Sequence, residues 1–410
     1  MSKTKVVYLV SGSRHTVPPN KNSPGVPRII EILSANDTAS IDYKVLSKYD
    51  DSLKLKDYNR SKYLHIKPTL WNRFFEKILH YVPMKTKKNI FGYALEDRIV
   101  YYEGIKRHIS RKKPDVVITF MHFELFKKLC KIHPNAKHIY FFRSTDLMMR
   151  LGDENIDFLL KNSSGFLANT KSPIDELKAL SPNLNFPTET IYNSVNLNDF
   201  SDKISDDLST QYRKKYNLTP DDFVIGYAGR LSEEKSILEL FEAVRYLKNK
   251  GCNIHLLIAG SLEIETTPNV HYYNEIVNFA KENLSNQVHF LGWLPNEKLY
   301  EFYNALDIGV LLSKYSEGNS MFLLESLSMG TPMIATSIGG NLEMITDGEN
   351  GFLIETENVK ENLIQKLEII ISNKTQLNQM SINALNYIKQ HHTNDIMVDK
   401  FNNFMQNFEE

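Results

Sequence analysis

The sequence predicts an α/β protein made of two doubly wound domains, each built on a parallel sheet. Short apolar segments alternate with amphipathic helical segments in two series, one from residue 113 to residue 193 and one beginning at Phe223. This alternation is typical of parallel sheets covered by helices. A polar, charged stretch at 201–220 separates the two series and has the composition of a linker. At 410 residues, the chain is long enough for two separate cores.

The overall composition argues against several classes of protein. Lys and Arg together number 49, as do Asp and Glu, and this balance disfavours a general nucleic-acid-binding protein. The cysteines, Cys130 and Cys252, have no metal-binding or redox spacing, which favours a reducing cytoplasm. No apolar run approaches the roughly 20 residues of a membrane span, and the apolar core of residues 1–13 is too short for a signal peptide. We therefore expect a cytoplasmic protein, with peripheral attachment to the inner face of the membrane as an alternative.

The first half of the chain opens with a strand at Val6–Val10 and a small-residue turn that contains Gly12. Gly12 would let the backbone approach a ligand, although a plain β-to-α turn explains it equally well. Further on, segment 71–88 combines aromatic and basic residues, with Trp71, Phe75, Ile78 and Leu79 on one helical face. Such a segment suits an anionic membrane surface. A core-facing helix with a solvated charged side is the more common explanation.

The first βα series predicts strands that end next to polar residues. Expected strands lie at 114–120, 138–142, 165–169 and 190–193, with a helix at 123–130. His122 follows the first of these strands, and Arg143 and Ser144 follow the second. A catalytic role for any of the three stays open at this point.

The second series starts with a strand at Phe223–Gly229 that leads into Arg230 and Lys235. These cations are five residues apart across a turn, so both can converge on one anion. The alternative is a surface pair that balances neighbouring glutamates. The glycine spacing here is not the Gly-x-Gly-x-x-Gly of dinucleotide-binding proteins, so a nicotinamide cofactor is not indicated. A later strand leads into Trp293 and Leu294, where Trp293 is either a ligand-binding or a core residue.

A short strand at 306–312, a polar loop and a helix that starts at Met321 form the most informative stretch. The backbone N–H groups of Asn319, Ser320 and Met321 at the helix N-terminus suit an anion. Glu317 and Glu325 flank them, and carboxylates there suit sugar or ribose hydroxyls rather than the anion itself. Together these features indicate a nucleotide sugar, although two glutamates at a given spacing also recur by chance.

This stretch resembles the Glu-x7-Glu motif of the retaining GT-B glycosyltransferases of family GT4. The resemblance continues through Gly339-Gly340 and the Asp347–Ile354 segment. Residues Gly229 to Ser236 resemble the family's Gly-Arg-Leu-x-x-x-Lys-Gly motif, with Ser236 in place of the last glycine, and residues 192–200 resemble the family's hinge.

The resemblance implies the GT-B fold, in which two Rossmann-like domains face a central cleft. Residues 1–200 would form the acceptor-binding domain, 201–220 the linker and 221–390 the nucleotide-sugar-binding domain. Residues 391–410 would form a helix that packs back on the N-terminal domain.

The resemblance also implies the activity of a retaining hexosyltransferase. The donor would be a nucleotide-diphosphate sugar and the acceptor a glycan or a lipid-linked glycan, in cell-surface polysaccharide or glycolipid synthesis. Arg230 and Lys235 would stabilise the leaving diphosphate, while Glu317 would bind hydroxyls of the donor sugar. No Asp-x-Asp occurs, and we expect no metal and no cofactor. The expected donor-binding residues are Gly12, Gly229, Trp293, Leu294, Gly318, Asn319, Ser320, Met321 and Glu325. A non-catalytic GT-B subunit that binds a partner or glycan, and a GT-B sugar-nucleotide epimerase, are the alternatives.

Overall fold

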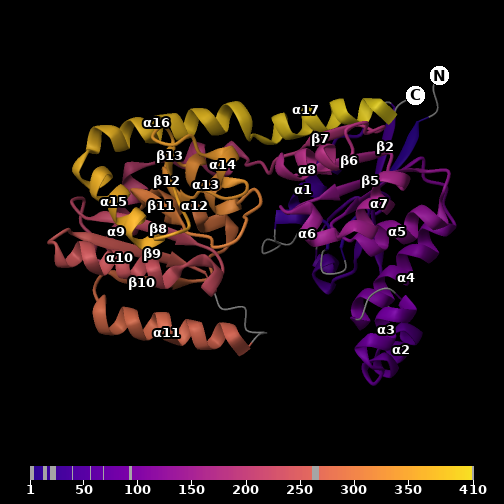
Figure 1. Cartoon of the computed structure of the whole chain (residues 1–410), viewed down its shortest axis with the longest axis horizontal. Helices are drawn as coiled ribbons and strands as arrows, with labels where there is room; N and C mark the ends of the chain where they lie inside the picture. The colour runs from indigo at the N-terminus through magenta and orange to yellow at the C-terminus, as the bar shows by residue number, and fades with distance from the viewer. Residues whose placement is uncertain are drawn as a thin grey trace. The chain divides into compact units, whose positions relative to one another are not determined.

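The computed structural model describes residues 4–12, 16–18, 25–38, 40–55, 57–67, 69–91, 95–260 and 267–408 (Figure 1). The chain divides into two compact units. Unit 1 comprises Met1–Ile191 together with Met397–Glu410, and unit 2 comprises Tyr192–Ile396. The stretch 201–220, which we expected as a linker, contains helix α9 (Asp206–Lys215) and belongs to unit 2.

Unit 1 is built on a sheet whose paired strands all run parallel. In the part that the structure describes, seven strands follow the order β3-β2-β1-β4-β5-β6-β7. Strand β1 contributes Val7 and Leu9 to one buried core and Tyr8 and Val10 to another, so both of its faces are covered. The strands are β1 (Lys5–Val10), β2 (Ile41–Lys48), β3 (Tyr63–Ile66), β4 (Val116–Phe120), β5 (Lys137–Phe142), β6 (Gly165–Ala168) and β7 (Thr188–Thr190).

The helices of unit 1 cover both faces of this sheet. The C-terminal helix α17 (Asn394–Met405) places Met397, Phe401 and Phe404 in the same core as Val7 and Leu9, which agrees with the predicted packing of a last helix on the N-terminal domain. The other helices of this unit are α1 (Gly25–Ser34), α2 (Leu70–His80), α3 (Met84–Phe91), α4 (Glu96–Ser110), α5 (Phe123–Ile132), α6 (Leu147–Leu151), α7 (Asp153–Asn162) and α8 (Ser172–Leu180).

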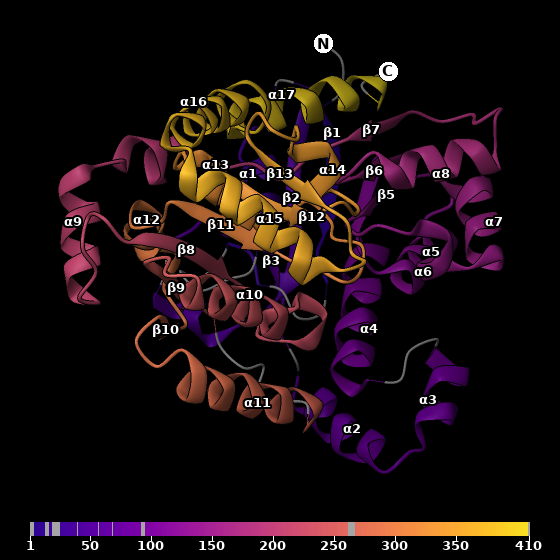
Figure 2. The same ribbon diagram turned by 60° about the vertical axis from the view of Figure 1, so that its left-hand side comes forward.

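Unit 2 repeats the same plan with six strands in its described part. Their order is β10-β9-β8-β11-β12-β13, and all paired strands are parallel. Figure 2 shows α10 and α15 side by side over this sheet, and the two helices pack against each other. The strands are β8 (Phe223–Ala228), β9 (Ile254–Ala259), β10 (Val288–Gly292), β11 (Ile308–Leu311), β12 (Met333–Thr336) and β13 (Gly351–Ile354). The remaining helices are α10 (Ile237–Asn249), α11 (Thr267–Asn283), α12 (Leu299–Asn304), α13 (Met321–Ser328), α14 (Asn341–Met344), α15 (Val359–Ser372) and α16 (Lys374–His391).

Both sheets reverse their strand order at one point, between β1 and β4 in unit 1 and between β8 and β11 in unit 2. In open parallel sheets, ligands bind outside the carboxyl ends of the strands at such a switch point. The topology therefore directs attention to the segments after β1 and β4, and to those after β8 and β11.

Helix α2 differs from the core-facing helix that is the common explanation for its pattern. Its aromatic face is exposed: Trp71 retains 80% and Phe74 57% of their accessible surface, and only Leu79 of the predicted face is buried. Both views place α2 and α3 at the end of α4 that lies away from the sheet of unit 1 (Figures 1 and 2). The amphipathic pattern is present, but α3 and α4 cover only part of its apolar side: Phe75 contacts the Phe91 ring and Leu79 is buried, while Trp71 stays exposed.

Candidate active site

The carboxyl ends of β8, β9 and β10 form a pocket of about 330 Å³ in unit 2. Gly229, Trp293 and Leu294, which the sequence singled out separately, all line it, and so does Arg230. Trp293 is half exposed, at 49%, so it is not a core residue. The pocket joins an exposed aromatic side chain to a floor of glycine backbone, which is a suitable environment for the flat ring of a nucleobase.

Glycine is required in this floor because two backbone segments approach each other closely. A Cβ atom at Gly260 would lie 2.0 Å from the Gly229 carbonyl oxygen. The N–H of Gly229 donates to the Ala259 carbonyl at 2.9 Å, and the N–H of Gly260 donates to the Gly292 carbonyl at 2.8 Å. The three strand ends are thus held together by main-chain contacts that exclude a side chain at Gly260.

Lys235 and Glu317 meet at the switch point of the unit 2 sheet. Their side chains form an ion pair that is largely buried, with 13% and 22% of the side-chain surfaces exposed. The Ser313 hydroxyl, just beyond β11, donates to Glu317 at 2.8 Å and lies 3.1 Å from the Lys235 ammonium. A cation, a carboxylate and a hydroxyl from three segments therefore form one polar cluster.

Arg230 has a different partner from Lys235. Its guanidinium forms an ion pair with Glu234 at 2.8 Å and keeps 54% of its side-chain surface exposed. Its carbonyl accepts a hydrogen bond of 2.6 Å from the Tyr227 hydroxyl, and burial, with the charge of Glu317, raises the pKa of Tyr227. The structure thus places Arg230 at the rim of the pocket and Lys235 in the buried cluster, each neutralised by its own carboxylate.

The N-terminus of α13 presents a row of main-chain donors beside this cluster. Within the residues that the structure describes, the N–H groups of Gly318, Asn319, Ser320 and Met321 donate to no protein acceptor. Ser320 is the N-cap residue, but its side chain makes no capping hydrogen bond. These N–H groups and the positive end of the helix dipole favour an anion.

The Asn319 side chain has a structural role, whereas the donor contact predicted for this residue is its main-chain N–H group. It is buried, and its oxygen accepts a 2.8 Å hydrogen bond from the N–H of Asn193. The Asn193 side chain in turn donates to the Asn319 carbonyl at 2.5 Å. The loop is also held by the N–H of Gly340, which donates to the Glu317 carbonyl at 2.7 Å. These bonds fix the backbone that carries Glu317 and the free N–H groups.

Glu325 lies on the second turn of α13 and is only 9% exposed. The Tyr303 hydroxyl donates to its carboxylate at 2.9 Å. Burial and this neighbouring carboxylate raise the pKa of Tyr303, so Tyr303 remains a hydrogen-bond donor at neutral pH. Because the hydrogen bond from Tyr303 fixes the orientation of the Glu325 carboxylate, its remaining lone pairs can accept hydrogen bonds from ligand hydroxyl groups.

Ser236 explains why the related motif ends in glycine. Its φ of +50° lies in the left-handed region, at the junction between the turn that carries Lys235 and helix α10. Glycine adopts this conformation at no steric cost. This chain forms the same turn with a serine.

In unit 1, the switch point brings together Gly12 and His122. A Cβ atom at Gly12 would lie 2.1 Å from Nε2 of His122, so the imidazole occupies the space that a larger residue would need. Met121 has a φ of +66°, and the N–H of His122 donates to the Phe120 carbonyl at 2.8 Å, which closes a tight γ-turn. The sequence leaves the role of His122 open, since the only sign of a site there is that the residue follows a predicted strand. Arg143 instead lies over the Phe141 ring, 5.3 Å from its centroid.

Residues 209–387 match the family model described as glycosyl transferases group 1. This segment of the chain is a glycosyl transferases group 1 domain. The glycosyltransferase CapM of capsular polysaccharide biosynthesis in Staphylococcus aureus is 26% identical over 48% of this chain, and the match spans 49% of CapM. The lipopolysaccharide 1,2-N-acetylglucosaminetransferase of Salmonella typhimurium is 22% identical over 80% of this chain and 84% of its own length. The matched range, residues 209–387, contains all the predicted donor-site residues except Gly12.

A solved structure covers nearly the whole chain. The Anabaena protein HepE, in complex with UDP and glucose, superposes with a TM-score of 0.71 over 98% of this chain and 100% of its own, at 15% identity. Likeness at this identity shows the fold alone. The predicted GT-B fold, two parallel-sheet domains covered by helices, is confirmed.

Proposed function

We propose that the protein is a retaining hexosyltransferase that uses a nucleotide-diphosphate sugar and needs no metal. The observation that carries the proposal is the cluster of Lys235, Glu317 and Ser313 beside the open N–H groups of α13. The cluster combines the Lys235 ammonium, the Glu317 carboxylate as an acceptor for hydroxyl groups, and main-chain N–H groups that can bind an anion. The same unit contains the pocket lined by the half-exposed Trp293. Support also comes from the HepE complexes with UDP and with UDP-glucose.

The cluster has the charges that departure of a nucleoside diphosphate requires. As the bond between the sugar and the diphosphate breaks, negative charge develops on the phosphate oxygens and must be stabilised. The Lys235 ammonium and the N–H groups at 318–321 can bind those oxygens, and Arg230 can reach them from the rim once it leaves Glu234. These groups would supply the positive charge that a metal supplies elsewhere.

The two glutamates would position the donor through hydroxyl groups. Glu317 would accept hydrogen bonds from the sugar, and its ion pair with Lys235 fixes the carboxylate in place. Glu325, held by Tyr303, would accept hydrogen bonds from the ribose. In the proposed front-face reaction, the acceptor oxygen bonds to the anomeric carbon on the side from which the diphosphate leaves. The acceptor proton passes to the departing phosphate oxygen. Because the new bond forms on the face that the diphosphate leaves, the anomeric configuration is retained.

The variant Glu317→Gln tests this assignment. It keeps the shape of the side chain but weakens the hydroxyl contacts and the hold on Lys235. Each charged hydrogen bond contributes about 1.5–3 kcal/mol, so turnover should fall roughly tenfold or more. The assay is nucleotide release and product anomer by NMR, with UDP-hexoses as the first donors. Wild-type turnover in the variant would remove Glu317 from the reaction.

The same assay separates the alternatives. An epimerase would convert the sugar nucleotide without transferring the sugar to an acceptor. A non-catalytic subunit would release no nucleotide from any donor, with or without acceptor. A β-configured product from an α-linked donor would contradict retention.

We further propose that the acceptor is a glycan or a lipid-linked glycan and that the protein acts at the inner face of the membrane. Within the described residues, no helix is long and apolar enough to cross a bilayer. The exposed face of α2 and α3 supports peripheral attachment: Leu70, Trp71 and Tyr81 keep 80% or more of their surface. The same two helices carry exposed cations that favour anionic lipids, namely Arg73, Lys77, Lys85 and Lys88.

The two tryptophans of the chain allow a specific test of attachment. Trp71 lies on the exposed face and Trp293 in the pocket of unit 2. In a Trp293→Phe variant, we expect Trp71 fluorescence to shift to the blue with vesicles of phosphatidylcholine and phosphatidylglycerol, but not with phosphatidylcholine alone. A Trp71→Phe variant serves as the control, in which Trp293 fluorescence should not change. Absence of a shift in both lipids would exclude this face as a membrane contact.

A further inference from the structure

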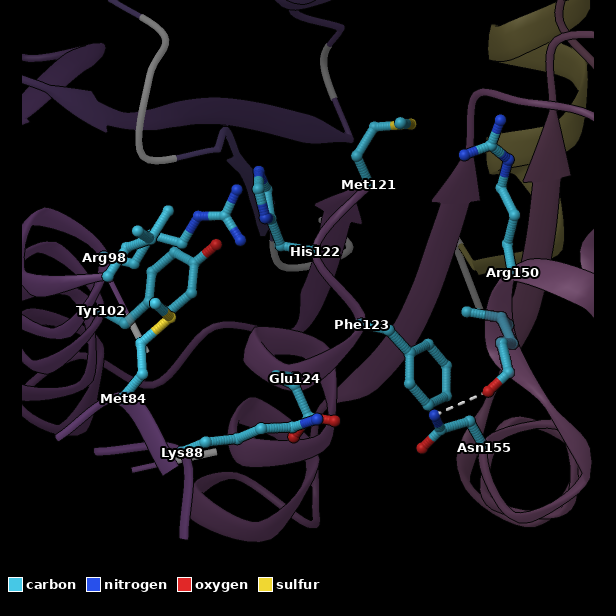
Figure 3. Close-up of a pocket in the computed structure, with 12 residues that line it drawn as sticks. Met84, Lys88, Arg98, Tyr102, Met121, His122, Phe123, Glu124, Arg150 and Asn155 are labelled. Carbon is cyan, nitrogen blue, oxygen red and sulfur yellow. Dashed lines mark hydrogen bonds between the residues drawn. The ribbon is translucent and has the colours of Figure 1, made fainter. Parts of the chain in front are cut away.

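The second pocket of interest lies in unit 1, beyond the carboxyl end of β4, and has a volume of about 440 Å³ (Figure 3). Three cations from three helices line it: Lys88 of α3, Arg98 of α4 and Arg150 of α6. Figure 3 shows Arg98, Tyr102 and His122 together on one side and Arg150 on the other. The positive charge of the pocket therefore comes from three separate helices.

These cations lack the partners that neighbouring lysines have. In the described part of the chain, Lys88, Arg98 and Arg150 form no ion pair, and Nε of Arg98 is buried without a hydrogen-bond partner. Lys87, the adjacent residue on α3, is buried and paired with Glu96. Among the described residues that line the pocket, the carboxylate is that of Glu124, which is paired with Lys127 at 2.6 Å. The pocket thus retains an excess of positive charge.

The backbone at the edge of this pocket is held in a conformation that needs support. Met121 is in the left-handed region at a φ of +66°, and its carbonyl accepts a 2.9 Å hydrogen bond from the Tyr140 hydroxyl. The His122 ring stands edge-on to Tyr102, with centroids 5.6 Å apart. Strained backbone that the surrounding structure enforces is typical of ligand sites.

We propose that this pocket binds the phosphate group of the acceptor. Two guanidinium groups and an ammonium match phosphate, since arginine binds its oxygens through paired N–H groups. The pocket is larger than one phosphate, and Met84, Leu95 and Phe123 add apolar lining for the group to which the phosphate is attached. The acceptor would therefore be a phosphate or diphosphate ester. This inference rests on the proposed glycosyltransferase function and specifies the chemical class of its acceptor.

Methionine methyl groups provide local reporters for both sites. Met84 and Met121 line the unit 1 pocket, Met321 begins helix α13 in unit 2, and Met397 and Met405 are buried in the core of unit 1. In the full chain with ¹³C-methyl methionine, inorganic pyrophosphate should shift the signals of Met84 and Met121. Unchanged Met397 and Met405 signals would verify that unit 1 stays folded.

Arg98→Gln and Arg150→Gln should each weaken pyrophosphate binding, read at Met84 and Met121, by about tenfold or more. Arg111→Gln is the matched control, because Arg111 is an exposed cation at the end of the same helix α4 and should leave affinity unchanged. Wild-type affinity in both pocket variants would overturn the proposal. So would the absence of any shift at Met84 and Met121.

Competition identifies the source of the phosphate. Displacement of pyrophosphate by phosphatidic acid in phosphatidylcholine vesicles would support a lipid headgroup, and displacement by glycerol 3-phosphate alone would support a soluble phosphate ester. Failure of both competitors would overturn the proposal. The proposed function is tested separately at Met321: a nucleotide response there without one at Met84 and Met121 leaves the glycosyltransferase standing and removes only the phosphate pocket.

Discussion

The two units have the same sheet topology, but they prepare their sites in different ways. In unit 2, each charged residue of the predicted site has a partner: Lys235 with Glu317, Arg230 with Glu234, and Glu325 with Tyr303. In unit 1, the described part of the pocket leaves Lys88, Arg98 and Arg150 without ion pairs. The comparison teaches that the same sheet topology can carry paired charges at one switch point and unpaired cations near the other, and the two proposals assign these arrangements to a nucleotide sugar and to a phosphate group.

The glycines at the two switch points give the largest expected difference between the units. At Gly260, a Cβ atom would meet the main-chain carbonyl of Gly229, which cannot move without parting β8 from β9. At Gly12, it would meet the His122 ring, which can rotate. Gly260→Ala should therefore lower the free energy of unfolding of unit 2 by about 3 kcal/mol, and Gly12→Ala should cost unit 1 about 1 kcal/mol or less.

Segment-resolved amide hydrogen exchange measures both changes in one experiment, since β8–β9 and β1–β4 report on different units. If Gly12→Ala instead lowers the free energy of unfolding more than Gly260→Ala does, the imidazole of His122 must be as rigidly held as the main-chain carbonyl of Gly229. That result would break the contrast between a rigid donor floor and an adjustable unit 1 site.

Acidification should produce a smaller effect that both units share. Burial lowers the pKa of His138 in unit 1, and burial lowers the pKa of the stacked His255 and His289 in unit 2. In the unfolded chain, each of these histidines takes up a proton as the pH falls below the ordinary pKa of 6.5. In the folded protein, the same histidine takes up its proton only at a lower pH, because its pKa is lowered. Stability is therefore full above pH 6.5 and is lost as the pH falls from there through the lowered folded values.

The slope from each histidine is at most about 1.4 kcal/mol per pH unit. Urea unfolding between pH 7.5 and 5 should show the loss, and His289→Asn should flatten the profile of unit 2 without changing that of unit 1. An equal slope in the variant would mean that His289 titrates alike in both states.

The sequence predicted unit 2 in more detail than unit 1, for a physical reason. The strands of unit 2 are apolar, and its loops carry the motifs that hold Lys235, Glu317 and Glu325. Strand β2 was not predicted although Ile41, Tyr43 and Val45 alternate with polar residues, as in a strand with one buried face. Strand β3, Tyr63–Ile66, is too short for its period to be read from the sequence. Periodicity located the apolar face of α2, but a period cannot say whether another element covers that face.

The features of the two sites that the sequence did not predict depend on contacts between residues far apart in the chain. The bonds between Asn193 and Asn319 join segments 126 residues apart and hold the backbone whose N–H group the sequence predicts as a donor contact. His122 meets Gly12 only because the sheet order places β4 beside β1. The pair of Arg230 with Glu234 agrees with the alternative of a surface pair that balances neighbouring glutamates, whereas the sequence gives no sign that Lys235 pairs with Glu317. Whether Arg230 and Lys235 converge when a diphosphate is bound stays a prediction.

The most direct test of the donor site is calorimetric titration of UDP, GDP and ADP, without added metal, into three proteins. Besides wild type, these are Lys235→Ala and the matched control Lys250→Ala, which breaks the exposed pair of Lys250 with Glu368 in the same unit. We predict that one nucleotide binds wild type and the control equally. Because Lys235→Ala removes a charged contact of about 1.5–3 kcal/mol, its affinity should fall roughly ten- to a hundredfold. Equal affinity in Lys235→Ala, or no binding of any of the three nucleotides, would contradict the assignment of unit 2 as the donor site.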